Sequence, residues 1–184
     1  MKYFLFIVAC LFTHPLWAIP LWGGAESGML APQVLKKFEG AIAPAKQSVL
    51  ATGITKKVCI PSHKYLGHEF LVHFYFSDGG LQQVTLELKN PGRRAELKKF
   101  VESIDKDLSK AFGEPERSNT DNSAMRTIGV VWSTPTQRVS VIAVNYGPTE
   151  EISNGGFLNI NYQQQETKKP NNKTAQTDGD KHSK

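Results

Sequence analysis

Four residues in one short stretch carry side chains that could bind a metal ion: Cys59, His63, His68 and His73. A thiolate and imidazoles are ligands that suit zinc. His68 and His73 are an odd number of positions apart, so on one straight strand they would face opposite sides of a sheet. Only a loop through this stretch could bring the four side chains together. These four residues are candidate metal ligands, but their spacing does not favour a shared metal site.

The same stretch offers the closest approach to a nucleophilic site, because Cys59 beside a histidine could form a thiolate–imidazole pair. The simpler interpretation of Cys59, in KVCIP, is a small apolar residue on a strand. The chain has no Gly-x-Ser-x-Gly elbow, no His-Glu-x-x-His motif and no phosphate-binding loop. We therefore identify no catalytic and no cofactor-binding residue, and expect no cofactor. The sequence favours a non-enzymatic protein.

The N-terminus has the pattern of a secretory signal peptide. Lys2 supplies a positive charge, the apolar run YFLFIVACLF follows, and Ala18 offers a small residue for cleavage. The run is about half the ~20 apolar residues that a membrane-spanning helix needs. We expect residues 1–18 to be removed by cleavage after Ala18, giving a periplasmic or secreted protein without a transmembrane segment in the mature chain. The alternative is a lipoprotein with lipid on Cys10, in the lipobox-like IVAC.

The C-terminal segment 163–184 is polar and basic. It reads QQQETKKPNNKTAQTDGDKHSK and has no apolar residue larger than Ala175. Such a segment cannot bury enough surface to offset the entropy of ordering, so we expect a disordered tail, either a tether or a solvated end. Its lysines supply much of the net charge of +5. The rest of the chain has no basic patch interleaved with aromatics, so we expect no nucleic-acid partner.

The chain between residues 19 and 162 repeats its own landmarks. SDGGL (Ser77–Leu81) matches SNGGF (Ser153–Phe157), and VLKKFEG (Val34–Gly40) parallels LSKAFGE (Leu108–Glu114). Helical spacing of apolar residues predicts one helix near Pro32 and another over Ala95–Phe112. Alternating runs flanked by turn residues predict antiparallel hairpins. We therefore expect an α+β domain, with an antiparallel sheet, helices packed on one face, and two tandem helix-then-strands units of about 30–90 and 95–162.

One face of this sheet is a candidate partner surface. The alternation of EFLVHFYF and LQQVTLEL places most large apolar side chains on one side of the strands. The opposite side then carries the mixed set Leu71, His73, Tyr75, Thr85 and Glu87. Aromatic and polar side chains together suit an interface, so we expect this face to contact a partner.

The segments LSKAFGEPER and VVWSTPTQRVSVIAV resemble the small exported bacterial modules of the SmpA/OmlA and β-lactamase-inhibitor-protein type. Those modules also place a helix with a glycine–proline stop before antiparallel strands, and the inhibitor-type proteins carry two such units in tandem. The resemblance covers roughly residues 32–162 in the order of its helices and strands. The residues that match specifically are Phe112-Gly113-Glu114-Pro115 and the two Gly-Gly turns. It implies an envelope protein that binds other proteins and performs no chemistry. The single mature cysteine, Cys59, departs from inhibitor-type proteins that have disulfides.

These observations predict an exported, periplasmic, non-enzymatic module whose partner is an envelope or extracellular protein. The alternative is a carrier of a small ligand or metal, or a hydrolase, that uses a pocket between the sheet and the helices.

Overall fold

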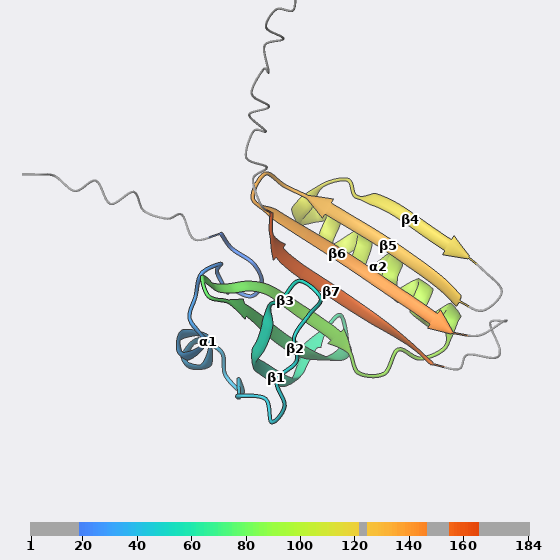
Figure 1. Ribbon diagram of the computed structural model, residues 1–184. Helices are drawn as coiled ribbons and strands as arrows, with labels where there is room; N and C mark the ends of the chain where they lie inside the picture. The colour runs from blue at the N-terminus through green and yellow to red at the C-terminus, as the bar shows by residue number, and fades with distance from the viewer. Residues whose placement is uncertain (1–18, 122–124, 147–154, 166–184) are drawn as a thin grey trace, which may run out of the picture.

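Antiparallel β-strands dominate the computed structural model, which describes residues 19–121, 125–146 and 155–165 (Figure 1). The predicted α+β class and antiparallel sheet are confirmed. In chain order the described elements are α1 (Ala31–Lys37), β1 (Thr55–Tyr65), β2 (His68–Ser77), β3 (Gly80–Leu88), α2 (Arg94–Phe112), β4 (Glu116–Asp121), β5 (Met125–Ser133), β6 (Gln137–Tyr146) and β7 (Gly156–Gln164).

The described strands form one seven-stranded sheet in the order β1-β2-β3-β7-β6-β5-β4. Each half of the chain is a helix followed by an antiparallel meander, and the last strands of the two halves, β3 and β7, pair at the centre. There Val84 lies opposite Tyr162 and Leu86 opposite Ile160. One hydrophobic core therefore runs through both halves.

Helix α2 covers the half of the sheet that contains β5 and β6, behind the strands in Figure 1. Its apolar residues recur at helical spacing, so that Leu97, Phe100, Ile104 and Leu108 are all buried. The helix ends at Gly113, whose φ of +80° suits a residue without a side chain, and Pro115 follows. The sequence predicted this helix to within one residue at its start.

The N-terminal segment and α1 cover the other half of the same face. Trp22 stacks on Phe38 at a centroid distance of 6.0 Å, and Phe38 lies 5.2 Å from Phe74 of β2. Trp22 is thus half-buried against the core. Leu35 of α1 is 37% exposed, because a helix this short turns only Val34 into the core.

The hairpin between β1 and β2 is longer than the sequence suggested. The segment PSHKYLGH is mostly strand and not the loop that would be needed to gather the candidate metal ligands, because β1 continues to Tyr65 and only Leu66 and Gly67 turn the chain. Both turn residues have positive φ, as a tight two-residue hairpin requires. Strand β1 tolerates Pro61 because the pairing with β2 is irregular there.

Strands β4 and β7 also differ from expectation. β4 reads ERSNTD, with no apolar alternation, and gave no sequence signal. β7 runs through Gln164, so the domain extends past Tyr162, because Gln163 and Gln164 pair with β6. Residues 1–18, with the expected cleavage after Ala18 and the lipid alternative at Cys10, lie outside the described residues, as do residues 166–184 of the tail.

Candidate functional site

Both described helices and the N-terminal segment pack on one face of the sheet, so no helix of the described residues lies on the opposite face. We call this opposite side the open face. Because side chains alternate along a strand, alternate residues of neighbouring strands lie side by side on it. From β2 across to β6 it carries Leu71, His73, Tyr75, Gln83, Thr85, Glu87, Phe157, Asn159, Asn161, Gln163, Arg138, Ser140, Ile142, Val144 and Tyr146.

The predicted partner residues all belong to the open face, but most of them are not accessible. His73 is 8% exposed, Tyr75 7% and Thr85 5%, while Leu71 and Glu87 are partly buried. Tyr75 and His73 therefore lie beneath the accessible surface and offer a partner little area to contact. This corrects the expectation that His73, Tyr75 and Thr85 are accessible to a partner on this face.

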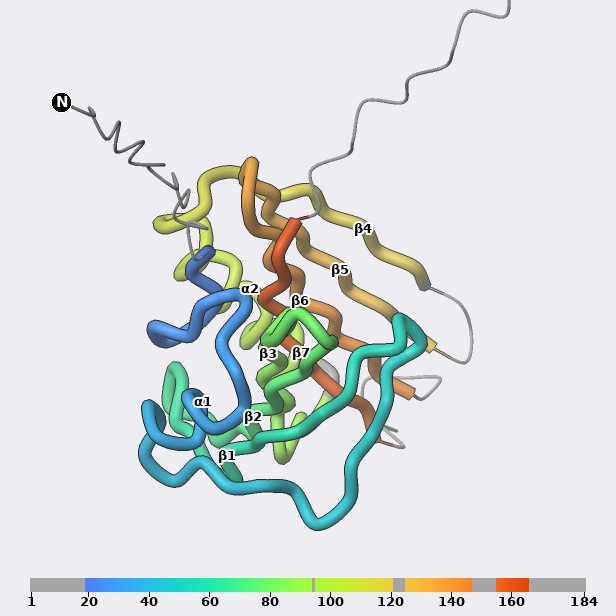
Figure 2. Tube along the Cα trace, turned by 60° about the vertical axis from the view of Figure 1, so that its left-hand side comes forward, coloured from blue at the N-terminus to red at the C-terminus, as the bar shows by residue number. Residues whose placement is uncertain are grey.

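The chain between α1 and β1 accounts for part of this burial. It makes an extended excursion, cyan to teal in Figure 2. The excursion closes into a small hairpin where Val49 bridges Thr55, and this hairpin places Ser48 beside the Tyr75 hydroxyl. Burial raises the pKa of Tyr75, so the phenol stays neutral. Nothing in the sequence of residues 41–54 indicated this packing.

His73 and Glu87 form the charged pair of this face. His73 Nε2 lies 2.9 Å from Glu87 Oε2. The hydrogen bond to His73 lowers the pKa of Glu87, and this effect outweighs desolvation. His73 Nδ1 is buried and has no hydrogen-bond partner among the described residues. The pair is an ion pair across strands β2 and β3 when His73 is protonated.

A chain of neutral polar side chains continues from β3 to β6, and we call it the polar ladder (Gln83, Thr85, Ser140, Asn161 and Gln163). Thr85 Oγ1 donates to Asn161 Oδ1 at 2.9 Å, and Gln83 Nε2 donates to Thr85 Oγ1 at 2.8 Å. Gln163 Nε2 donates to Gln83 Oε1 at 2.5 Å, and Asn161 Nδ2 reaches Ser140 Oγ at 3.4 Å. Such connected networks hold their amides in fixed orientations.

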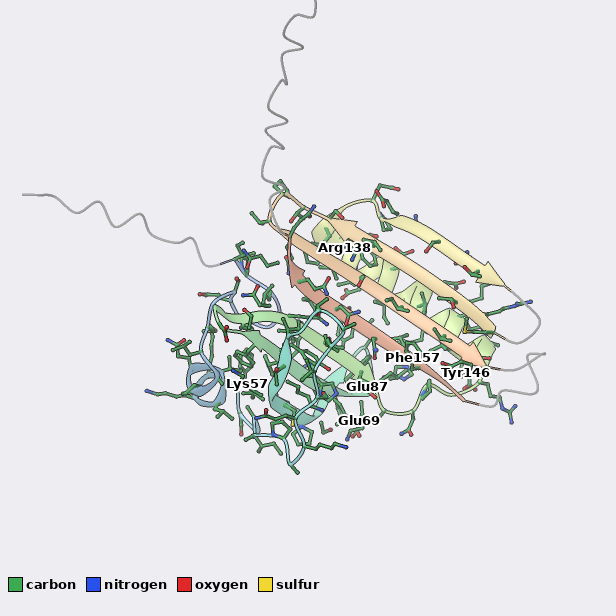
Figure 3. All side chains as sticks on the ribbon, in the orientation of Figure 1. Lys57, Glu69, Glu87, Arg138, Tyr146 and Phe157 are labelled. Atoms are coloured by element: carbon green, nitrogen blue, oxygen red, sulfur yellow. The ribbon has the colours of Figure 1, made fainter. Side chains whose placement is uncertain are left out.

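An apolar patch adjoins the ladder, and we call it the β6–β7 patch (Ile142, Val144, Tyr146 and Phe157). Ile142 is 38% and Tyr146 43% exposed, Phe157 is half-buried, and Val144 is buried between them. Val144 lies directly opposite Phe157 in the register. Figure 3 shows Tyr146, Phe157 and Glu87 toward the same end of the sheet, with Arg138 at the other end of β6. These residues were not predicted as partner contacts, although Ile142, Val144 and Tyr146 lie in the alternating segment RVSVIAVNY and Phe157 begins the alternation of FLNINY.

The candidate metal ligands are divided between the two faces. Cys59 and His73 are opposite each other on the open face, whereas His63 and His68 belong to the helix side. His63 meets the edge of Trp22 at 4.9 Å, and His68 stacks on Phe100 at 3.9 Å. Burial lowers the pKa of His63, which favours its neutral form. No group of three or more His, Cys, Asp or Glu in the described part of the chain is arranged to hold a metal.

The alternative site, between the sheet and the helices, corresponds to a hollow of about 220 Å³ between α2 and strands β4 and β5. Asp105 and Arg117 line it and close an ion pair at 2.9 Å. Ser109 Oγ donates to Asp105, and Trp132 Nε1 donates to Ser109, so these polar groups are committed to one another. The arrangement fastens α2 to the sheet.

Neither described helix could cross a bilayer, since neither combines enough length with enough apolar character. A scan against protein-family models, a search of curated proteins and a search of solved structures each found no match to this chain, and so they neither confirm nor refute its resemblance to the small exported bacterial modules.

Proposed function

We propose that this chain is an exported, periplasmic, non-enzymatic module that binds an envelope protein through its open face. The observation that carries the proposal is the β6–β7 patch, where Ile142 and Tyr146 are accessible on a sheet face that neither described helix covers. Export rests on the signal-peptide pattern of residues 1–18.

The composition of the open face suits a protein partner. An accessible isoleucine, tyrosine and phenylalanine form its apolar part, and the polar ladder borders them. Interfaces between proteins combine an aromatic-rich centre with a hydrogen-bonding rim. The patch is small, so we expect moderate affinity that depends on a few residues.

The rigidity of the face favours binding without a large rearrangement. β6 and β7 are interior strands with a continuous antiparallel register from Gln137 to Asn145. The ladder beside the patch is hydrogen-bonded, which limits the side-chain entropy lost on association. The partner that fits has an apolar side chain to place against Tyr146 and neutral polar groups to meet the ladder.

The test is affinity capture from a cell-envelope extract with matched variants. Ile142→Ser removes the apolar contact on the open face, whereas Leu35→Ser makes the same change on α1. The two side chains are 38% and 37% exposed, so the variants differ mainly in location. We expect Ile142→Ser to weaken the affinity for the partner about tenfold, which corresponds to ~1.4 kcal/mol of binding free energy, so that much less partner stays bound. Leu35→Ser should retain the partner as the unchanged chain does.

Equal retention by Ile142→Ser and the unchanged chain would contradict the proposal. A further bait that ends at Gln165 removes the tail and keeps β7 intact, because β7 runs through Gln164. Retention by this shorter bait places binding on the sheet, whereas its loss would move binding to the tail.

A further inference from the structure

A groove opens at the end of the open face away from the β6–β7 patch. It has a volume of about 580 Å³ and lies between the excursion that precedes β1 and the paired ends of β3 and β7. Its lining consists of Thr52, Ile54, Ser77, Gln82, Gln83, Gln163 and Gln164. A volume of this size falls within the range of about 300–1,000 Å³ typical of small-molecule sites. We call it the amide groove.

An irregularity in β3 builds one wall of the groove. Tyr75 pairs with Gln83 and Phe76 with Leu81, so Gln82 is an extra residue without a partner on β2. Neighbouring residues on a regular strand point to opposite faces, but a β-bulge re-aims the inserted side chain. Gln82 and Gln83 can therefore line the same groove.

The groove amides are partly engaged by the polar ladder and partly available. Gln83 uses both amide hydrogens on Thr85 and Asn161 and accepts one from Gln163. Gln163 keeps one N–H and its carbonyl oxygen, and no hydrogen bond engages the Gln82 side chain within the described residues. Gln164 Oε1 accepts from Ser27 Oγ at 2.5 Å, which leaves its amino group. The ladder thus orients Gln163 and the bond to Ser27 orients Gln164, and both of these amides, like that of Gln82, keep hydrogen-bonding capacity for a ligand.

The chemistry of the lining selects the ligand. Carboxamides both donate and accept, as sugar hydroxyls do, so each pairs well with the other. The described lining holds no charged side chain. Arg138, on the neighbouring strand β6 opposite Gln163, adds an accessible donor near the rim. Ile54 is the one large apolar side chain of the lining, enough for a methyl group or a sugar ring edge.

We propose that the amide groove binds a neutral carbohydrate of about one or two residues in length. A peptide fits less well, because β3 and β7 are interior strands whose backbone groups already pair with each other and with β2 and β6. A bound peptide could not add a strand there, and one apolar side chain offers little to its side chains. The lining formed by the described residues has no aromatic side chain for stacking, so we expect millimolar affinity.

The experiment follows the side-chain amide resonances of the purified chain by NMR while a neutral disaccharide is added. Maltose and N,N′-diacetylchitobiose serve as probes, and inorganic phosphate is the anionic control. Gln82→Leu and Thr52→Val alter the lining at positions that bond to nothing in the ladder. Gln47→Leu is the matched control, because Gln47 is exposed on the same excursion but outside the lining.

We expect saturable shifts of the Gln82, Gln163 and Gln164 amides with at least one disaccharide. Affinity should fall about tenfold in Gln82→Leu and also fall in Thr52→Val, and it should not change in Gln47→Leu. Shifts with phosphate alone, no saturable shift with either disaccharide, or unchanged affinity in both lining variants would overturn the proposal. Its failure is separable from that of the protein-binding proposal, because the capture assay varies Ile142 of the β6–β7 patch, whereas the NMR titration varies Gln82 and Thr52, which belong to neither the patch nor the ladder.

Discussion

Asn161 is the residue on which the polar ladder depends most. Its carbonyl oxygen accepts from Thr85 at 2.9 Å and from Gln83 at 3.3 Å, and its amino group reaches Ser140. Thr85 and Gln83 are both buried, so water cannot readily replace a lost partner. Asn159, on the same strand and the same face, has a buried Oδ1 without a hydrogen-bond partner among the described residues.

These two asparagines make a matched pair for mutation. We expect Asn161→Leu to lower the free energy of unfolding by about 1–3 kcal/mol, because it leaves buried donors unpaired. Asn159→Leu should change it by less than about 0.5 kcal/mol or increase it, because it removes an unsatisfied acceptor. Chemical denaturation of both variants measures the difference. Equal destabilisation of the two variants would contradict this, because it would show that the hydrogen bonds of Asn161 add no measurable stability.

Single residues also show which properties the sequence could predict and which it could not. Alternation placed Leu71, His73 and Tyr75 on the open face, which is where they lie. It could not show that Tyr75 and His73 are buried, because part of that burial comes from the distant Ser48 segment. The glutamine pairs of the amide groove carried only a weak signal, two adjacent amides on each of two strands. Their convergence needs the β3–β7 pairing and the bulge at Gln82.

At the scale of elements, the turn between β2 and β3 is the most tightly constrained. Gly80 has φ of +97°, and a Cβ built there would lie 2.3 Å from the carbonyl oxygen of Gly28. The backbones meet because Gly28 N donates to Leu81 O and Leu81 N donates to Met29 O. The turn therefore anchors the N-terminal segment to the sheet. Gly79, its neighbour, would meet only side-chain atoms at 3.7 Å or more.

We expect Gly80→Ala to destabilise the protein by about 2 kcal/mol or more, because strain and a backbone clash combine. Gly79→Ala should cost less than about 1 kcal/mol, because its φ is not positive and its contacts are ordinary. Urea denaturation of the two variants provides the comparison. A small effect at Gly80 would mean that the N-terminal segment can move away from the turn.

Elements with strong periodicity were predictable and polar or interrupted ones were not. Helix α2 and strands β2, β3, β6 and β7 combine regular apolar spacing with glycine turns. β4 exists because its backbone pairs with β5 from Glu116 to Asp121, although its side chains show no alternation. β1 was underestimated because Pro61 normally interrupts a strand, and here an irregular pairing accommodates it. Backbone pairing with a neighbour is a tertiary property that local patterns do not report.

At the scale of the whole molecule, the pairing of β3 with β7 determines which surfaces of the protein are available for binding. It joins two helix-and-meander halves into one sheet, and both helices then share one face. The other face is left with a polar ladder, an apolar patch at one end and an amide groove at the other. A chain with this architecture can present two separate binding surfaces on one rigid sheet.

The central claim is that the open face contacts a protein in the envelope. The most direct measurement incorporates the photo-crosslinking residue p-benzoylphenylalanine at Tyr146 and, in a second sample, at Leu35 in living cells. Tyr146 is 43% exposed on the open face and Leu35 is 37% exposed on α1. Binding of a protein through the open face predicts a discrete crosslinked species from position 146 and none from position 35. No adduct at position 146, or the same adducts at both positions, would contradict it.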